Sequence, residues 1–198
     1  MKIPLKYQSA EYDCVPTTFM NGLNYLLDRD KIEPMVIKTI MAYSLDSFDK
    51  KGAFGKGGTS KMAVRLLTKW LDEYSETINL GIKLEYLMGE EIELDRNRII
   101  EQCIGEGGVF LPCICLKNSV FHYVLVTDMD QSNVYFFDPY AIEGQYESRD
   151  IEVIRDMPFK MNRRVKRERF NSHENIIYSL GKLEKREGIL IHKKNLHK

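Results

Sequence analysis

The spacing of apolar residues changes once along the chain, near Gly107, and this change constrains the fold more than any other feature. Before it, apolar residues recur at helical spacing in three segments, 16–27, 33–45 and 60–74. After it, β-rich runs are separated by turn residues, at 109–116, 123–128 and 134–137. Helices followed by antiparallel strands are typical of an α+β protein rather than of an alternating βαβ arrangement. We therefore predict an α+β fold in which an N-terminal helical part packs on a C-terminal antiparallel sheet.

Shorter patterns complete the predicted order of elements. Three further strands and one short helix are predicted, at 82–88, 174–180 and 188–192 and at 94–104. The pair Asn118-Ser119 predicts a tight connection between two strands. The chain has 198 residues and no evident linker or internal repeat, which fits one domain. We expect a single domain over 1–198, with a helical lobe at about 14–105 and a sheet lobe at about 107–192.

Each predicted helix has an apolar face that we expect to be buried. In the first helix this face consists of Phe19, Leu23, Leu26 and Leu27. In the third helix it consists of Met62, Leu66, Leu67, Trp70 and Leu71. The flexible thioethers of three methionines are expected to fill gaps in the core, at Met35, Met41 and Met62.

Cys14 is the one cysteine of four that lies where a predicted helix begins. Asp13 or Cys14 can cap this helix, and Pro16 suits its first turn because the missing proline N–H would have no partner there. The thiolate form of cysteine is the nucleophile, and a helix N-terminus stabilises that anion through its unpaired N–H groups and its dipole. Cys14 is therefore the candidate nucleophile for acyl transfer.

Of the four histidines, His122 opens a strongly apolar strand, whereas the other three lie in the charged C-terminal region. A histidine at a strand start can project into a cleft while the strand holds it rigidly. The next predicted strand ends at Asp138, so in an antiparallel hairpin the two side chains lie close enough for a carboxylate–imidazole contact. Such a contact fixes the tautomer of the imidazole and holds the ring toward the sulfur of Cys14.

Acyl transfer also needs hydrogen-bond donors for the oxyanion. The backbone N–H of Cys14 is one natural candidate. The side-chain amide of Gln8, six residues earlier, is the second. The candidate catalytic residues are therefore Gln8, Cys14, His122 and Asp138.

Four motifs taken together resemble those of a known family: the spacing Gln8-x5-Cys14, then Cys14-Val-Pro-Thr17, His122-Tyr-Val-Leu-Val126 and Asp138-Pro139. As a set they resemble papain-like cysteine peptidases, most closely the bacteriocin-leader-processing (double-glycine) peptidases and their stand-alone bacterial relatives. The resemblance covers roughly residues 5–30 and 107–141. It implies a papain-like fold and hydrolysis of a peptide bond through a Cys14 thioester. It also implies His122 as base, Asp138 as the group that orients it, and Gln8 as an oxyanion donor.

Val15 departs from this pattern, because glycine normally follows the family's cysteine. A side chain at this position can narrow the cleft or alter which peptides fit, although it removes no catalytic group. The family's transporter members attach this domain to a membrane export unit, and leader processing coupled to export is not implied here. Two other functions stay open: an acyltransferase that uses the same Cys-His-Asp site, and a non-catalytic relative that binds peptides.

The remaining motifs do not indicate a cofactor. Cys113 and Cys115 are separated by one residue, whereas zinc knuckles usually have Cys-x2-Cys. The glycine-rich loop 51–60 contains Gly-x-x-Gly-Lys, but a phosphate loop needs a longer spacing between its glycines and Ser or Thr after the lysine. We expect no metal and no cofactor, and we interpret the loop as a plain connector or as a flap that faces the substrate.

Charge and hydropathy limit the partners that we expect. The formal net charge is +0, which argues against an electrostatic search for nucleic acid. The densest basic cluster, which we interpret as a solvated strand or loop, contains Arg163, Arg164, Lys166, Arg167 and Arg169. Contact with nucleic acid or an anionic peptide is the alternative for this cluster. No membrane span or signal peptide is evident, so we expect a cytoplasmic protein that acts on a peptide or protein.

Overall fold

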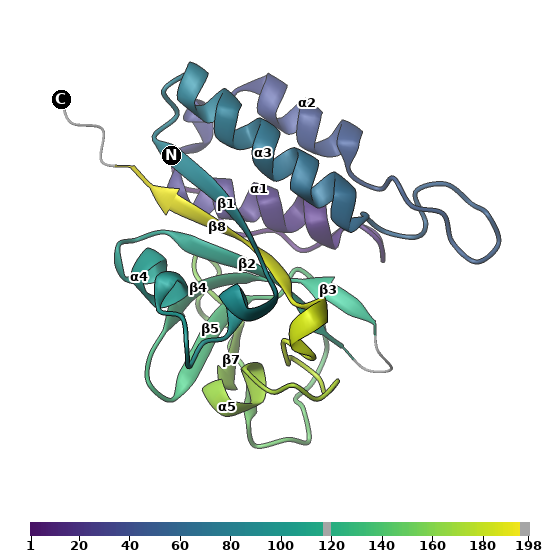
Figure 1. Ribbon diagram of the computed structural model, residues 1–198, viewed down its shortest axis with the longest axis vertical. Coiled ribbons are helices and arrows are strands. Elements are labelled where there is room, and N and C mark those ends of the chain that lie inside the picture. The colour runs from purple at the N-terminus through teal and green to yellow at the C-terminus, as the bar shows by residue number, and fades with distance from the viewer. Residues whose placement is uncertain (117–119, 195–198) are drawn as a thin grey trace.

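In the computed structural model, three N-terminal helices form a layer on one face of an antiparallel sheet (Figure 1): α1 (Cys14–Leu26), α2 (Pro34–Tyr43) and α3 (Lys61–Thr77). All three overlap the segments that helical spacing predicts, although α1 begins before residue 16 and α3 extends past residue 74. The structure describes residues 1–116 and 120–194, so the predicted connection at Asn118-Ser119 lies outside the described residues. Ser60 begins α3 as its N-cap, since its side chain accepts a hydrogen bond from the backbone N–H of Ala63.

The sheet has the strand order β1-β8-β2-β4-β5-β7-β6, and β3 pairs with β2 beside this path. Its strands are β1 (Ile82–Met88), β2 (Val109–Cys115), β3 (Phe121–Tyr123), β4 (Leu125–Met129), β5 (Asn133–Phe137), β6 (Ile151–Val153), β7 (Arg163–Lys166) and β8 (Glu187–Lys193). All the pairings between these strands are antiparallel. Helices combined with an antiparallel sheet confirm the predicted α+β class.

Helices cover both faces of the sheet. Two short helices, α4 (Ile99–Gly105) and α5 (Arg167–Phe170), lie on the face opposite α1 to α3 (Figure 1). Successive residues of β2 point to the two cores, with Val109 and Leu111 packed toward α1 and α3 and Phe110 and Ile114 packed toward α4. The expected packing therefore holds for α1 to α3. The predicted helical part also contributes β1 to the sheet and α4 to its opposite face.

Helix α1 lies close to the sheet because of Gly22. A Cβ at this position would lie 3.3 Å from Ile191 Cδ1, which is tighter than an ordinary contact. The predicted apolar face of α1 is confirmed, because each of its members is buried: Phe19, Leu23, Leu26 and Leu27. This packing fixes the position of the helix whose first residue is Cys14.

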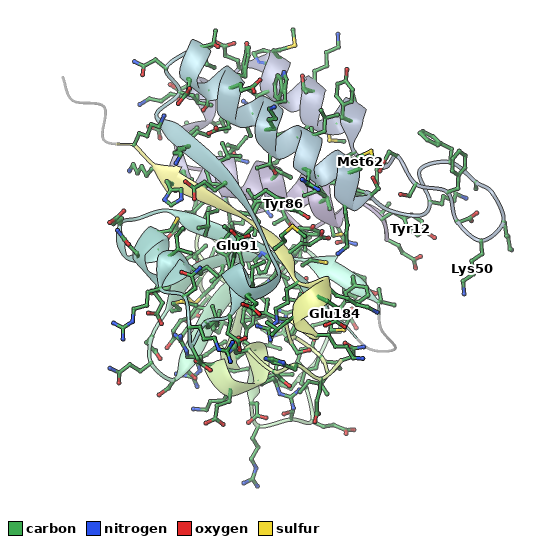
Figure 2. All side chains as sticks on the ribbon, in the orientation of Figure 1. Tyr12, Lys50, Met62, Tyr86, Glu91 and Glu184 are labelled. Carbon is green, nitrogen blue, oxygen red and sulfur yellow. The ribbon has the colours of Figure 1, made fainter. Side chains whose placement is uncertain are left out.

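The predicted face of α3 is confirmed at Leu67 and Leu71, which are buried, and is wrong at Met62 and Leu66. Met62 is 81% exposed and Leu66 is 52% exposed, and Figure 2 shows Met62 with Tyr12 and Lys50 on the side where the 44–60 loop projects. Thr68 and Ser75 are buried instead, because their hydroxyls donate hydrogen bonds to the backbone carbonyls of Val64 and Asp72. Apolar character alone does not identify such positions. Two other predicted core methionines are also exposed, Met35 and Met41.

Other differences from the predicted elements have local causes. The short helix α4 begins later than predicted, after Asn97, whose side chain accepts a hydrogen bond from the N–H of Ile99. The predicted strand at 174–180 is irregular, and Tyr178 within it has φ of 64°, which a strand does not allow. The predicted strand at 188–192 is confirmed as β8, and the two strands that were not predicted are β6 and β7.

Candidate active site

Cys14 is the first residue of α1, as the sequence predicts. Asp13 occupies the N-cap position of α1, but its side chain makes no hydrogen bond to the first turn of the helix. That carboxylate instead accepts hydrogen bonds from the N–H groups of Ser9 and Ala10, at 3.2 and 3.1 Å, and so folds the turn that leads into the helix. The first N–H groups of a helix have no partner within it, so the tip of α1 can stabilise negative charge beside the sulfur.

A hydrogen bond ties the first turns of α1 to the strand that carries His122. The buried hydroxyl of Thr18, one turn after Cys14, donates to the carbonyl of Tyr123 at 3.1 Å. Tyr123 directly follows His122 in β3. The cysteine and the histidine therefore come from two elements that are fixed to each other, although 108 positions separate them in the sequence.

The predicted contact between His122 and Asp138 is present, but the predicted strand at 123–128 is split into β3 and β4. Of these two strands, β4 pairs with β5, while β3 pairs with β2. His122 Nε2 lies 2.7 Å from Asp138 Oδ1, and both side chains are buried. Because the carboxylate accepts the Nε2 proton, Nδ1 is the nitrogen that remains for another partner. The thiol of Cys14 lies beside the same imidazole, close enough to raise the pKa of that ring. The structure thus brings Cys14, His122 and Asp138 together in that order.

The surroundings of His122 favour its protonated form. Burial alone lowers the pKa of the imidazole, but hydrogen bonds with Asp138 and Cys14 outweigh it and raise the pKa to about 10. Burial raises the pKa of Asp138, but the contact with His122 and the hydrogen bond from Tyr178 outweigh it, and the pKa is lowered overall. The pair therefore holds an imidazolium and a carboxylate at neutral pH.

These shifts predict how stability depends on pH. His122 has a folded pKa above its ordinary 6.5, so its contribution is complete below pH 6.5 and is lost as the pH rises toward about 10. Asp138 has a folded pKa below its ordinary 3.8, so its contribution is complete above that pH and is lost as the pH falls through the lowered value. We expect the difference in unfolding free energy between the wild type and His122→Gln to be larger at pH 6 than at pH 9. Urea unfolding at both pH values measures it, and an equal difference at both would contradict the assignment.

Asp138 is held by partners that the sequence did not reveal. The side-chain amide of Asn162 makes two hydrogen bonds to the backbone of Asp138. It accepts from the Asp138 N–H at 2.7 Å and donates to the Asp138 carbonyl at 2.8 Å. The hydroxyl of Tyr178 donates to Oδ2 at 2.6 Å, and the N–H of Tyr140 donates to Oδ1 at 2.8 Å. Asn162 and Tyr178 are 24 and 40 positions after Asp138, and no local motif connects them.

Arg163 corrects our interpretation of the basic cluster. In β7, burial alternates along the strand, so Arg164 and Lys166 are exposed while Arg163 is buried, with 2% of its surface accessible. The guanidinium of Arg163 donates to the Tyr178 hydroxyl at 3.0 Å and to the carbonyl of Asn162 at 2.9 Å. A cation that we expected in water therefore lies behind Asp138.

Gln8 lies beside the end of β5, next to the residues of the site. Its backbone N–H donates to the carbonyl of Pro139 at 2.8 Å, directly after Asp138. The preceding Tyr7 packs its ring on Phe137, with 5.2 Å between the ring centroids. One proton of the Gln8 amide is donated to the carbonyl of Ala10 at 2.9 Å, and the amide nitrogen carries a second proton for another acceptor.

A pocket of about 650 Å³ opens beside Cys14. It is lined by Cys14, Val15, Ser47, Gly57, Gly58, Thr59, Ser60, Lys61, Cys113, Val120, Phe121, Tyr123, Lys185 and Glu187. The end of the glycine-rich loop thus forms one wall of the pocket. The buried carboxylate of Glu187 accepts hydrogen bonds from the hydroxyls of Tyr123 and Tyr86, at 2.9 and 2.6 Å, and lies 3.3 Å from Lys61 Nζ.

The four cysteines are free thiols. Within residues 1–116 and 120–194, no three His, Cys, Asp or Glu side chains gather closely enough to hold a metal ion. Over the same residues, every helix is too short or too polar to cross a membrane. A comparison of the chain with models of protein families and with curated proteins finds no match in either set.

Proposed function

We propose that this chain is a papain-like cysteine peptidase that hydrolyses a peptide bond through a thioester at Cys14. The observation that carries the proposal is the sequence of contacts from Cys14 to His122 and from His122 to Asp138, with the sulfur at the tip of a helix. A papain-like fold is supported by the nucleophile at the start of α1 and by the histidine and aspartate on an antiparallel sheet. The substrate is a peptide or a protein.

In the proposed reaction, the Cys14 thiolate forms beside the His122 imidazolium, after the thiol proton has moved to Nδ1. The sulfur attacks the substrate carbonyl, and the oxyanion accepts hydrogen bonds from the Cys14 N–H and the Gln8 amide. The imidazolium then donates its proton to the leaving amine, and the C–N bond breaks to leave a thioester. Water, deprotonated by His122, attacks the thioester and releases the carboxylic acid and the free thiol.

Selective alkylation tests this proposal without a known substrate. Burial raises the pKa of Cys103 to about 12, raises that of Cys113 well above its ordinary value, and raises that of Cys115, which makes all three poor nucleophiles. We expect iodoacetamide at pH 7 to modify Cys14 at least about tenfold faster than the other three thiols, as measured by peptide mass spectrometry.

The matched control for this experiment is His122→Gln, which keeps Cys14 at the helix tip but removes the imidazolium. The rate at Cys14 should fall in this variant, while the rates at the other thiols should not change. Equal labelling of all four thiols in the folded wild type would contradict the proposed function.

A further inference from the structure

The second oxygen of Asp138 has a partner that is buried as deeply as the carboxylate itself. Tyr178 is 0% exposed, and its hydroxyl lies 2.6 Å from Asp138 Oδ2. The other oxygen, Oδ1, accepts hydrogen bonds from His122 Nε2 and from the N–H of Tyr140. Both oxygens of the carboxylate are therefore held, and the plane of the carboxylate is fixed relative to the imidazole.

The direction of the hydrogen bond from Tyr178 follows from Arg163. A guanidinium can only donate, and Arg163 Nε lies 3.0 Å from the Tyr178 oxygen, so this oxygen is the acceptor there. An ionised carboxylate can only accept, so the Tyr178 proton must be donated to Asp138. The hydroxyl of Tyr146 lies 2.6 Å from the same oxygen and fills its remaining acceptor position. Burial raises the pKa of Tyr178 well above its ordinary value, so the hydroxyl keeps its proton.

The backbone at Tyr178 is strained. Its φ of 64° belongs to the left-handed region, which is rare for a bulky side chain. The strain is maintained by surrounding contacts: the Tyr178 N–H donates to the carbonyl of Cys115 at 2.8 Å, and its ring packs edge-on against Phe136 and Tyr146. This conformation is what directs the hydroxyl to Asp138.

Charges alternate along the resulting chain of contacts. The Arg163 cation lies behind the neutral Tyr178, followed by the Asp138 anion and the His122 cation, which faces Cys14. The groups that face Asp138 are thus His122 from β3, Tyr178 with its partner Tyr146, and Arg163 from β7. Arg163 is the charge that offsets the buried carboxylate on the side away from the imidazole.

We propose that Tyr178 is a positioning residue, which holds Asp138 ionised and in plane with His122, and that Arg163 sets the direction of its hydrogen bond. The inference rests on the proposed function, because it assigns Tyr178 a role in preparing the Cys14–His122 pair. It extends the contacts of the site from three residues to five, and the two added residues come from parts of the chain outside the motifs at 5–30 and 107–141.

The test is the rate of Cys14 alkylation by iodoacetamide between pH 3 and pH 9 in Tyr178→Phe, a range that extends below the ordinary pKa of Asp138. Phenylalanine keeps the packing on Phe136 but removes a donor to the charged form of Asp138, which favours protonation of the carboxylate. We expect the acid limb of the profile to move to higher pH by about one unit. We also expect the plateau rate to fall several-fold, because the carboxylate is then held through Oδ1 and no longer through Oδ2.

A matched control is Tyr135→Phe, which removes a hydroxyl that donates to Asp130 at 2.8 Å on the outer side of β5. This variant should reproduce the wild-type profile. Tyr146→Phe is the second variant, because it removes a partner of the Tyr178 oxygen and leaves the contact with Asp138 in place. It should shift the acid limb in the same direction as Tyr178→Phe, by a smaller amount. If Tyr178→Phe does not fold, the presence or absence of this shift in Tyr146→Phe tests the role of Tyr178.

The outcomes separate this inference from the proposed function. If the wild type shows a fast, selective reaction at Cys14 and both network variants follow the Tyr135→Phe profile, the role of Tyr178 is wrong and the proposed function stands. If Cys14 in the wild type reacts no faster than the buried thiols, the proposed function is wrong, and the role of Tyr178 is wrong with it.

Discussion

Replacing Cys14 by alanine is expected to abolish peptide hydrolysis while leaving the fold intact. Removal of a nucleophile typically lowers turnover by at least about 10⁴-fold, because the remaining groups can only bind and polarise the substrate. Cys14 is partly exposed at the tip of α1, where it borders the core that the helix covers, and the hydrogen bond from Thr18 does not involve its sulfur. The unfolding free energy should therefore change by less than about 1 kcal/mol. Cleavage of a defined peptide mixture, followed by mass spectrometry, together with urea unfolding, measures both effects.

Cys103→Ala is the matched control, since it makes the same substitution at a thiol on the buried face of α4. It should lower stability by more than Cys14→Ala does, because it leaves a small cavity, and it should retain turnover. Hydrolysis that persists in Cys14→Ala at the wild-type rate would mean that another group performs the chemistry.

The second large effect is expected for Asp138→Asn, which should impair both stability and reactivity. The substitution removes the buried anion that lies between Arg163 and His122, and removing one member of a buried ion pair costs about 3–5 kcal/mol. It also turns an amide N–H toward the hydroxyl of Tyr178. The proton of that hydroxyl already points toward residue 138, so two hydrogen-bond donors face each other. Without its carboxylate, His122 loses the contact that favours its protonated form, so alkylation of Cys14 should slow markedly.

Urea unfolding and the iodoacetamide rate measure these two consequences separately. Asp130→Asn provides the comparison, because Asp130 also accepts a tyrosine hydroxyl and two backbone N–H groups, but at the surface. That variant should lose about 1 kcal/mol or less and should react normally at Cys14. If Asp138→Asn were as stable and as reactive as Asp130→Asn, the buried carboxylate would have no part in the site.

The three residues at the centre of the site could be predicted because each lies at or beside a boundary of a regular element. Cys14 begins α1, His122 lies in the three-residue strand β3, and Asp138 directly follows β5. We expect His122 and Asp138 to approach each other through the pairing of their strands. The contact is present, but β5 pairs with β4, whereas the strand of His122, β3, pairs with β2. The relation of Cys14 to the sheet came from the resemblance to papain-like peptidases, because local patterns do not specify contacts over such distances.

The residues behind Asp138 could not be predicted for the same reason. Asn162, Arg163 and Tyr178 reach the site through the pairing of β5 with β7 and through an irregular segment next to β2. Arg163 was assigned to solvent because its neighbours are charged, but a strand alternates its faces and buries every second residue. A buried arginine is satisfied here by a tyrosine hydroxyl and backbone carbonyls, and such partners leave no pattern in the sequence.

The central claim is that Cys14 and His122 form one reactive pair, in which the sulfur attacks and the imidazole takes its proton. The rate of Cys14 alkylation by iodoacetamide at pH 7 in the wild type, compared with the rate in His122→Gln, tests it most directly. We predict that the rate at Cys14 falls at least about tenfold in His122→Gln, while the rates at the buried thiols do not change. An equal rate at Cys14 in the two proteins would contradict the paired site and the proposed peptidase function that depends on it.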